Sequence, residues 1–194
     1  SHSASFYGSG FTLSNEFGHG SSIAVRALKG NRSSHVEFGD IIAHTFTLCS
    51  VTRYTETQDN EQNRILTGKP DLNLIHGHSD SKAGVAYFHN NWNTNTNLGH
   101  ADGVSPVTDW IVMCSTNAGG YPGNVLLNGN EIGIRAGGSG GNPWASLNIN
   151  PRLWAEQDSS FAIAELIVWD RGLTTAEMKE VSAYLSNAVL GYSY

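Results

Sequence analysis

The sequence predicts an all-β protein in which two antiparallel sheets pack face to face, with one short helix near the C-terminus. Short apolar or alternating runs are separated by turns rich in Asn, Asp and Gly, and 22 of the 194 residues are Gly. This pattern is typical of many short strands. Residues 161–170 form an almost continuous apolar run rich in β-branched side chains, which predicts a strand covered on both faces. A helix pattern follows directly from Thr174.

Alternation divides the side chains of the strand at 161–170 between its two faces. Glu165 interrupts the apolar run and requires a polar partner if it is buried. One face is predicted to hold Phe161, Ile163, Ile167 and Trp169, and the other Ala162, Ala164, Leu166 and Val168.

The helix pattern has a start, an apolar stripe and a stop. Thr174 with Glu177 three residues later forms a capping-box signature. Gly191 is a natural C-terminal stop. One face of the helix is predicted to pack against the rest of the protein. Its apolar residues, at three- and four-residue spacing, are Met178, Val181, Tyr184, Leu185 and Ala188.

The remaining elements are predicted as strands separated by polar turns. Residues 1–20 are expected to hold an edge strand and loops, and residues 89–103 a long Asn-rich loop. Asn128-Gly129 between apolar runs predicts a hairpin over 125–134. The other expected strands cover 23–29, 36–38 (ended by Gly39), 46–54, 64–67, 72–76, 83–88, 110–115 and 147–149.

Composition limits the classes of function. The formal net charge is −6 and no run rich in Lys or Arg is present, which argues against nucleic acid as a partner. No stretch approaches the ~18 apolar residues that a membrane span requires, so membrane insertion is not expected. The length suits one domain covering residues 1–194. The sequence leaves the oligomeric state open.

Two cysteine-containing strands indicate a family. The chain reads Phe46-Thr47-Leu48-Cys49 and Trp110-Ile111-Val112-Met113-Cys114, and an Asn-Gly hairpin follows the second. Over roughly residues 45–190 this order of parts resembles pentraxin-like and laminin-G-like domains of the concanavalin A-like lectin/glucanase group. The resemblance implies a jelly-roll sandwich.

The resemblance also implies a disulfide between Cys49 and Cys114. From the residues alone, two cysteines in mid-strand are compatible with a bridge or with small buried thiols. A bridge would indicate an extracellular setting, secreted or surface-displayed.

Acidic residues give two alternatives to simple binding. Glycosidases of this sandwich type carry a Glu-x-Asp-x-x-Glu strand, whereas Glu156-Gln157-Asp158 has no third carboxylate at that spacing. The missing carboxylate argues against catalysis, and a polysaccharide hydrolase or lyase using Glu156 and Asp158, or the histidines, is kept as an alternative to binding. The same triplet is similar to a calcium-binding triplet of pentraxins, with the insertion that follows it shortened. Glu156 and Asp158 are candidate calcium ligands, with Asp59-Asn60-Glu61 as a second segment, or both segments are ordinary solvated turns.

The loop His89-Asn90-Asn91-Trp92-Asn93 combines an aromatic ring with amides that both donate and accept hydrogen bonds. Such groups on a loop of a rigid scaffold favour glycan recognition. The function predicted from sequence is a non-catalytic, lectin-like or adhesion domain whose partner is a glycan or glycoprotein. A protein-interaction module is a further alternative. The predicted ligand-binding residues are His89, Asn90, Asn91, Trp92, Asn93, Trp144, His76 and His78. His76 and His78 are alternatively a candidate zinc-binding pair or hydrogen-bonded structural histidines. The Asn residues alternatively mark turns, with Trp92 closing the end of the sandwich.

Overall fold

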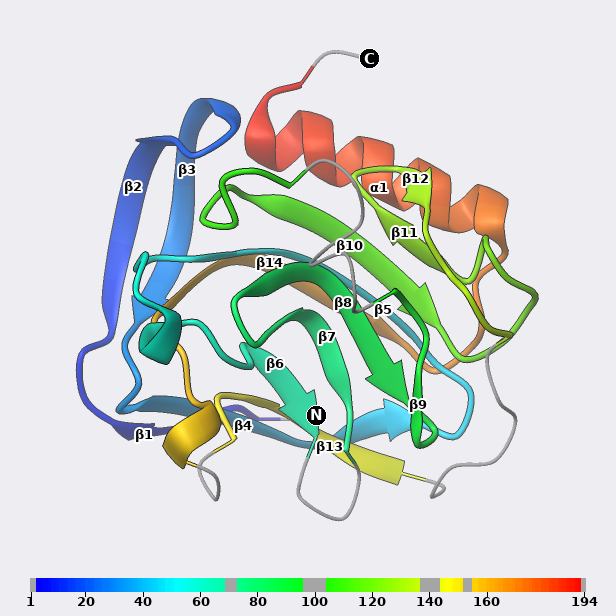
Figure 1. Ribbon diagram of the computed structural model, residues 1–194, viewed down its shortest axis with the longest axis horizontal. Coiled ribbons are helices and arrows are strands. Elements are labelled where there is room, and N and C mark those ends of the chain that lie inside the picture. Colours follow the sequence, from blue (N-terminus) through cyan, green and yellow to red (C-terminus); the bar gives the residue numbers. More distant parts are fainter. Residues whose placement is uncertain (1–2, 69–72, 96–103, 137–143, 152–154, 193–194) are drawn as a thin grey trace.

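The computed structural model describes residues 3–68, 73–95, 104–136, 144–151 and 155–192. Within these ranges the protein is a two-layered β-sandwich with one helix at its C-terminal end (Figure 1). All strand pairs in the two sheets are antiparallel. The predicted fold class is confirmed. No helix in the described ranges is sufficiently long and apolar to cross a membrane.

The described residues form seven strands in each sheet. Sheet A has the order β1 (Ser5–Gly8), β4 (Ser34–Ala43), β13 (Trp144–Ile149), β6 (Leu66–Gly68), β7 (Ile75–Ser79), β8 (Lys82–Phe88) and β9 (Asn91–Trp92). Sheet B has the order β12 (Asn130–Glu131), β11 (Val125–Leu127), β10 (Ile111–Thr116), β5 (Thr47–Tyr54), β14 (Phe161–Trp169), β3 (Ser21–Gly30) and β2 (Thr12–Gly18). Two 3-10 turns, η1 (Asp59–Glu61) and η2 (Ala155–Gln157), lie outside the sheets, and α1 covers Thr175–Leu190.

Apolar side chains from both sheets fill the space between the layers. One cluster joins Leu48 and Met113 of sheet B to Phe88 and Leu147 of sheet A. A second surrounds the buried ring of Tyr54. Strand β4 runs on past Gly39, where the sequence predicted an end, because register shifts in its pairing with β13 accommodate the irregularity.

The disulfide between Cys49 and Cys114 is present and joins adjacent strands of sheet B. The two residues are directly paired, and both are fully buried. They belong to a third apolar cluster on the outer face of sheet B, together with Met178 and Leu185 of α1. The bridge thus lies beneath the helix and ties the two strands that support it.

Helix α1 begins and ends as the sequence predicted. The Thr174 hydroxyl accepts from the Glu177 amide and Gly191 adopts a left-handed conformation at the C-terminus. The predicted stripe is only partly right, since Tyr184 is 65% exposed and Ala188 is exposed. Ser182 and Ser186 are buried instead. Their small side chains allow the helix to approach the sheet closely.

A β-bulge changes the predicted faces of β14. Its register against β5 shifts between Ile163 and Glu165, so alternation reverses along the second half of the strand. Leu166 and Val168 therefore pack between the sheets with Phe161, while Ile167 and Trp169 pack on the helix side with Ala162. The face prediction is correct before the bulge and wrong after it.

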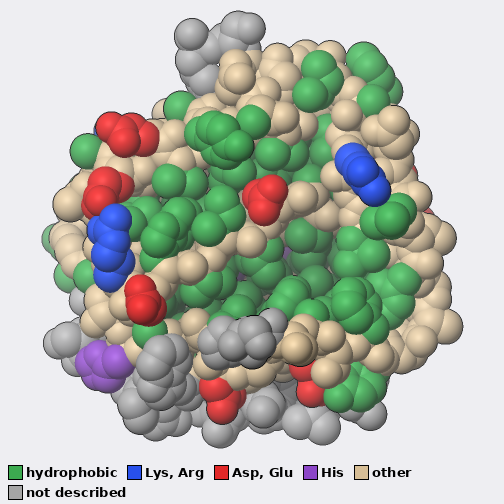
Figure 2. Space-filling model, turned by 180° about the vertical axis from the view of Figure 1, so that it is seen from behind, with side chains coloured by type: hydrophobic (Ala, Val, Ile, Leu, Met, Phe, Trp, Pro, Cys, Tyr) green, Lys and Arg blue, Asp and Glu red, His purple; other side chains and the backbone are tan. Residues whose placement is uncertain are grey.

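The predicted cover on both faces of β14 is also incomplete. Strand β3 pairs with β14 only from Phe161 to Ile163, and residues 164–169 are all half-buried. Beyond this point β3 places Val25 and Ala27 in the apolar cluster under α1. Seen from the side opposite to Figure 1, hydrophobic side chains occupy much of a hollowed surface (Figure 2).

A buried arginine of β5 fastens the β2–β3 hairpin to the central strands of sheet B. Arg53, 2% exposed, donates to a carboxylate oxygen of Glu16, and its guanidinium lies 5.4 Å from the centre of the Trp110 ring. Lys29 donates to the other Glu16 oxygen at 2.6 Å. Burial acts to raise the pKa of Glu16, but hydrogen bonds from Lys29 and Arg53 outweigh it and hold the pKa below 4.5.

We expect Glu16→Gln to lower the free energy of unfolding by about 3 kcal/mol, because it leaves the buried Arg53 charge without its counter-ion. Lys29→Met is the control and should cost less than about 1 kcal/mol, since Lys29 is more exposed. Urea denaturation of both variants measures the difference. The lowered pKa stabilises the wild type above pH 4.5 and this contribution fades below it. A Glu16→Gln variant as stable as Lys29→Met would contradict this account.

Candidate functional site

The segment predicted as a long Asn-rich loop begins with a tight hairpin. Strand β9 pairs back on β8, with Phe88 opposite Asn91 and Tyr87 opposite Trp92. The two linking residues, His89 and Asn90, have φ angles of 53° and 59°. Two consecutive left-handed residues form the turn that best matches the twist of paired strands, and Asn tolerates this conformation. Residues 96–103 lie outside the described ranges.

The hairpin presents two aromatic rings at the edge of sheet A. The rings of Tyr87 and Trp92 meet edge to face with centroids 5.2 Å apart. Both side chains are half-buried. Edge-to-face packing orients both rings, so their exposed surfaces are held in place.

Buried polar groups fix the residues that follow Trp92. The Asn93 amide donates to the carbonyl oxygens of Phe88 (3.2 Å) and Asn91 (2.9 Å). The Thr94 hydroxyl accepts from the backbone of Ala86 at 3.0 Å. Asn93, predicted to bind ligand, is 2% exposed and instead holds the hairpin together.

A segment from sheet B completes the site. After β12, the Ile134 amide donates to the Asn93 carbonyl at 2.9 Å, and the buried Asn124 side chain donates to the Arg135 carbonyl at 2.8 Å. The Arg135 guanidinium donates to the Asn91 side-chain oxygen at 3.4 Å. The edge of sheet A is thereby joined to the chain leaving the edge of sheet B.

These elements surround an open hollow of about 450 Å³, which we call the Trp92 hollow. Its described lining combines two aromatic rings, several amides, two hydroxyls and one cation. Such a lining can cover an apolar sugar face and bond to its hydroxyls. The lining residues are Tyr87, Asn90, Asn91, Trp92, Thr94, Asn95, Ile134 and Arg135.

Of the residues that line the Trp92 hollow, the sequence prediction includes Asn90, Asn91 and Trp92 but not Tyr87, Thr94, Asn95, Ile134 or Arg135. Tyr87 could have been found by recognising His89-Asn90 as a two-residue turn, because that turn places Tyr87 opposite Trp92. Arg135 carries no comparable local signal. Its place at the hollow depends on the bond from the neighbouring Ile134 amide to Asn93 and on the bond from Asn124 to the Arg135 carbonyl.

His89 does not line the Trp92 hollow. Its ring Nε2 lies 2.9 Å from the side-chain nitrogen of Asn117, which also donates to the His44 carbonyl. His89 therefore links the hairpin turn to sheet B as a structural residue.

His76 and His78 are buried inside the sandwich rather than on a ligand-facing surface. His76 Nδ1 lies 2.8 Å from the Ser115 hydroxyl, and the His78 ring packs edge to face on Tyr54 at 4.6 Å. Burial lowers the pKa of each to about 3, so both are neutral at physiological pH. This burial agrees with the alternative that His76 and His78 are structural histidines. Trp144 is the first residue of β13, and its side chain lies outside what the structure describes.

The two acidic segments considered for calcium do converge. The Arg64 amide donates to Gln157 and the Ser160 amide donates to Glu61. Glu156 is exposed, whereas Asp158 is 2% exposed and lies 4.0 Å from His35. Burial raises the pKa of Asp158 to about 6, against the charge of Arg32.

No group of three or more His, Cys, Asp or Glu side chains within the described ranges is placed to hold a metal ion. The carboxylate of Glu61 already accepts from Ser160 at 2.6 Å. Glu156 and Asp158 thus differ in exposure and in surroundings.

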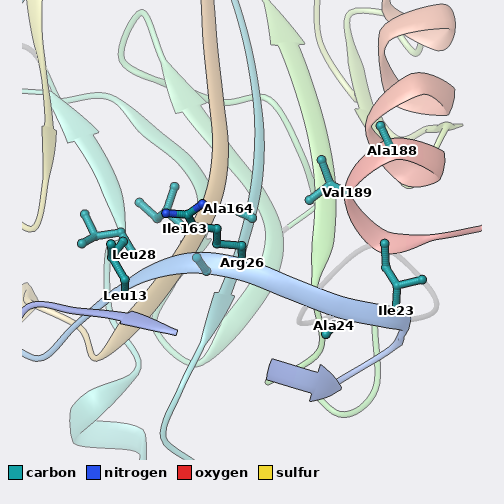
Figure 3. A pocket seen from close by; sticks show the side chains of 10 residues that line it. Leu13, Ile23, Ala24, Arg26, Leu28, Ile163, Ala164, Ala188 and Val189 are labelled. Atoms are coloured by element: carbon teal, nitrogen blue, oxygen red, sulfur yellow. The ribbon is translucent and has the colours of Figure 1, made fainter. Parts of the chain in front are cut away.

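A second hollow, of about 530 Å³, has different chemistry. It lies between the β2–β3 hairpin, β14 and the end of α1 (Figure 3). Its lining, as far as the structure describes it, is aliphatic with Arg26 as one cation and has no aromatic ring or amide side chain. It therefore lacks the groups that make the Trp92 hollow suitable for a sugar.

No protein-family model and no curated protein matches the chain. Solved structures match its fold. Domain 4 of AbnA, an extracellular GH43 arabinanase from Geobacillus stearothermophilus solved with arabinotriose, has a TM-score of 0.57 at 12% identity, covering 92% of this chain and 87% of that one. Trypanosoma rangeli sialidase with 2,3-difluorosialic acid has a TM-score of 0.54 at 17% identity, covering 96% and 34%.

The binding domain of Paraclostridial Mosquitocidal Protein 1 has a TM-score of 0.54 at 10% identity, covering 96% of this chain and 48% of that one. The chain thus spans about a third of the sialidase and about half of the toxin domain. At these identities the likeness concerns the fold. The similar structures are domains of carbohydrate-active proteins and of a toxin.

Proposed function

We propose that this protein is a glycan-binding domain of the concanavalin A-like type that takes its ligand in the Trp92 hollow without cleaving it. The observation that carries the proposal is the convergence of Trp92 and Tyr87 with Asn90, Asn91 and Arg135 around one open hollow. The rings offer apolar faces and the amides offer paired donors and acceptors. This is the combination that a sugar ring and its hydroxyls require.

The comparisons support a carbohydrate-related role. One similar domain was solved with arabinotriose and another belongs to a sialidase. The Cys49–Cys114 disulfide supports an extracellular, secreted or surface-displayed setting, since disulfides persist in oxidising compartments. A hydrolase acting through Glu156 and Asp158 receives less support, because Asp158 is buried.

We expect Trp92→Ala to weaken glycan binding about tenfold or more, because it removes the ring that stacks on the sugar and loosens Tyr87. A glycan array that includes arabinotriose identifies the ligand, and calorimetry of wild type and variant measures the loss. Tyr184→Ala is the matched control, since Tyr184 is 65% exposed on α1 and lies outside the hollow. Equal binding by wild type and Trp92→Ala would refute the proposed site.

A further inference from the structure

Among the described residues that line the Trp92 hollow, Arg135 is the one that carries a charge. The other lining side chains are aromatic, amide, hydroxyl or aliphatic. Glu131, the acidic residue nearest to Arg135 in the sequence, pairs with Lys179 at 2.6 Å. The positive charge of Arg135 is therefore not neutralised by any carboxylate in the described lining.

Hydrogen bonds to the backbone of residues 134 and 135 fix the position of Arg135. Asn124, 1% exposed, fixes the Arg135 carbonyl at 2.8 Å, and the preceding amide is bonded to Asn93. The Ile134–Asn93 bond attaches this segment to the hairpin that carries Trp92, and the Asn124 bond attaches it to the chain just before β11 in sheet B. The side chain contacts Asn91 at 3.4 Å, so the guanidinium lies beside an amide of the hollow.

A guanidinium has five N–H donors in a planar fork. Within the described residues, Asn91 is the one side chain that accepts a hydrogen bond from Arg135. The remaining donors can hold both oxygens of a carboxylate, a geometry that Arg provides and Lys does not. The chain carries a net charge of −6, so attraction of an anion to this hollow depends on Arg135 at short range.

We propose that the Trp92 hollow selects glycans that carry a carboxylate, such as uronic-acid oligosaccharides, with Arg135 binding the carboxylate and Trp92 covering the sugar ring. The inference deepens the proposed function and rests on it. In this arrangement Arg135 determines which sugars bind, whereas Trp92 and Tyr87 provide affinity for acidic and neutral sugars alike.

The test uses matched probe pairs. Trisaccharides of galacturonate, glucuronate, mannuronate and guluronate are each compared by calorimetry with the same trisaccharide after reduction of its carboxyl groups. We expect at least one uronate to bind tenfold or more tightly than its reduced form. Arg135→Gln should remove this preference and leave the reduced form bound as before. Arg135→Lys should retain part of it, and Trp92→Ala should weaken both members of the pair.

Arg26→Gln is the control, because Arg26 is an exposed arginine that lines the other hollow. It should leave the preference unchanged. If neutral probes bind through Trp92 while the carboxylate and Arg135 make no difference, the acidic preference is wrong and the glycan-binding function stands. If no probe binds in a Trp92-dependent manner, the proposed function fails and this inference fails with it.

Discussion

Acidification should destabilise this protein from about pH 6.5 downward, because His76 and His78 are buried in the neutral state. Burial lowers the pKa of both from 6.5 to about 3, and the charge of a protonated His76 would oppose protonation of His78. Their Nε2 atoms have no hydrogen-bond partner among the described residues. A proton added there would therefore be poorly solvated.

The direction in which stability changes with pH follows from the protons that the folded and unfolded states bind. Between pH 6.5 and 3 the unfolded chain binds a proton at each histidine and the folded protein does not, so the free energy of unfolding falls as pH falls. Two such groups cost up to about 2.7 kcal/mol per pH unit. Asp158 acts in the opposite direction between pH 6 and 3.8, because its raised pKa lets the folded state take up a proton first. The three groups together leave a loss of about 1.4 kcal/mol per pH unit in that window.

Urea denaturation at pH 7, 6 and 5 measures this slope. The double variant His76→Gln/His78→Gln should be less stable at pH 7 but nearly insensitive to pH between 7 and 6. His44→Gln is the matched control, since His44 is exposed, and it should keep the wild-type slope. A double variant that retained the full slope would show that other groups cause the acid sensitivity.

The fold was predictable where local pattern and tertiary structure agree. The capping box at Thr174, the stop at Gly191 and the Asn128-Gly129 turn each have a cause within a few residues of themselves. The prediction failed where an irregularity in strand pairing changed the alternation of side chains. The bulge after Ile163 reverses the faces of β14, and no residue type in that run signals it.

The candidate site was likewise predictable where its residues are adjacent in sequence and not where tertiary contacts place them. That Trp92, Asn90 and Asn91 lie together was predictable because they are adjacent in sequence. Alternation placed His76 and His78 on one face of a strand, but it does not tell which face is the interior. Arg135 was not predictable, since its place in the hollow depends on the bond between Ile134 and Asn93 and on the bond between Asn124 and the Arg135 carbonyl.

Loss of the Cys49–Cys114 bridge should lower the free energy of unfolding by about 4 kcal/mol in the chain-entropy model, because the bridge closes a loop of 65 residues. That loop contains β7, β8 and β9, and so includes the hairpin that carries Trp92. Cys49→Ala/Cys114→Ala should therefore unfold at lower urea concentration than the wild type, and added reductant should change the variant no further.

The matched control is Val51→Ala/Val112→Ala, a directly paired and fully buried couple on the same two strands. It also loses packing in the cluster under α1, but it keeps the bridge and should remain sensitive to reductant. The decrease in the free energy of unfolding that reductant causes in the wild type measures the entropic contribution of the bridge. If reductant left wild-type stability unchanged while mass analysis confirmed two free thiols, packing of the sulfur atoms rather than loop closure would account for the stabilisation.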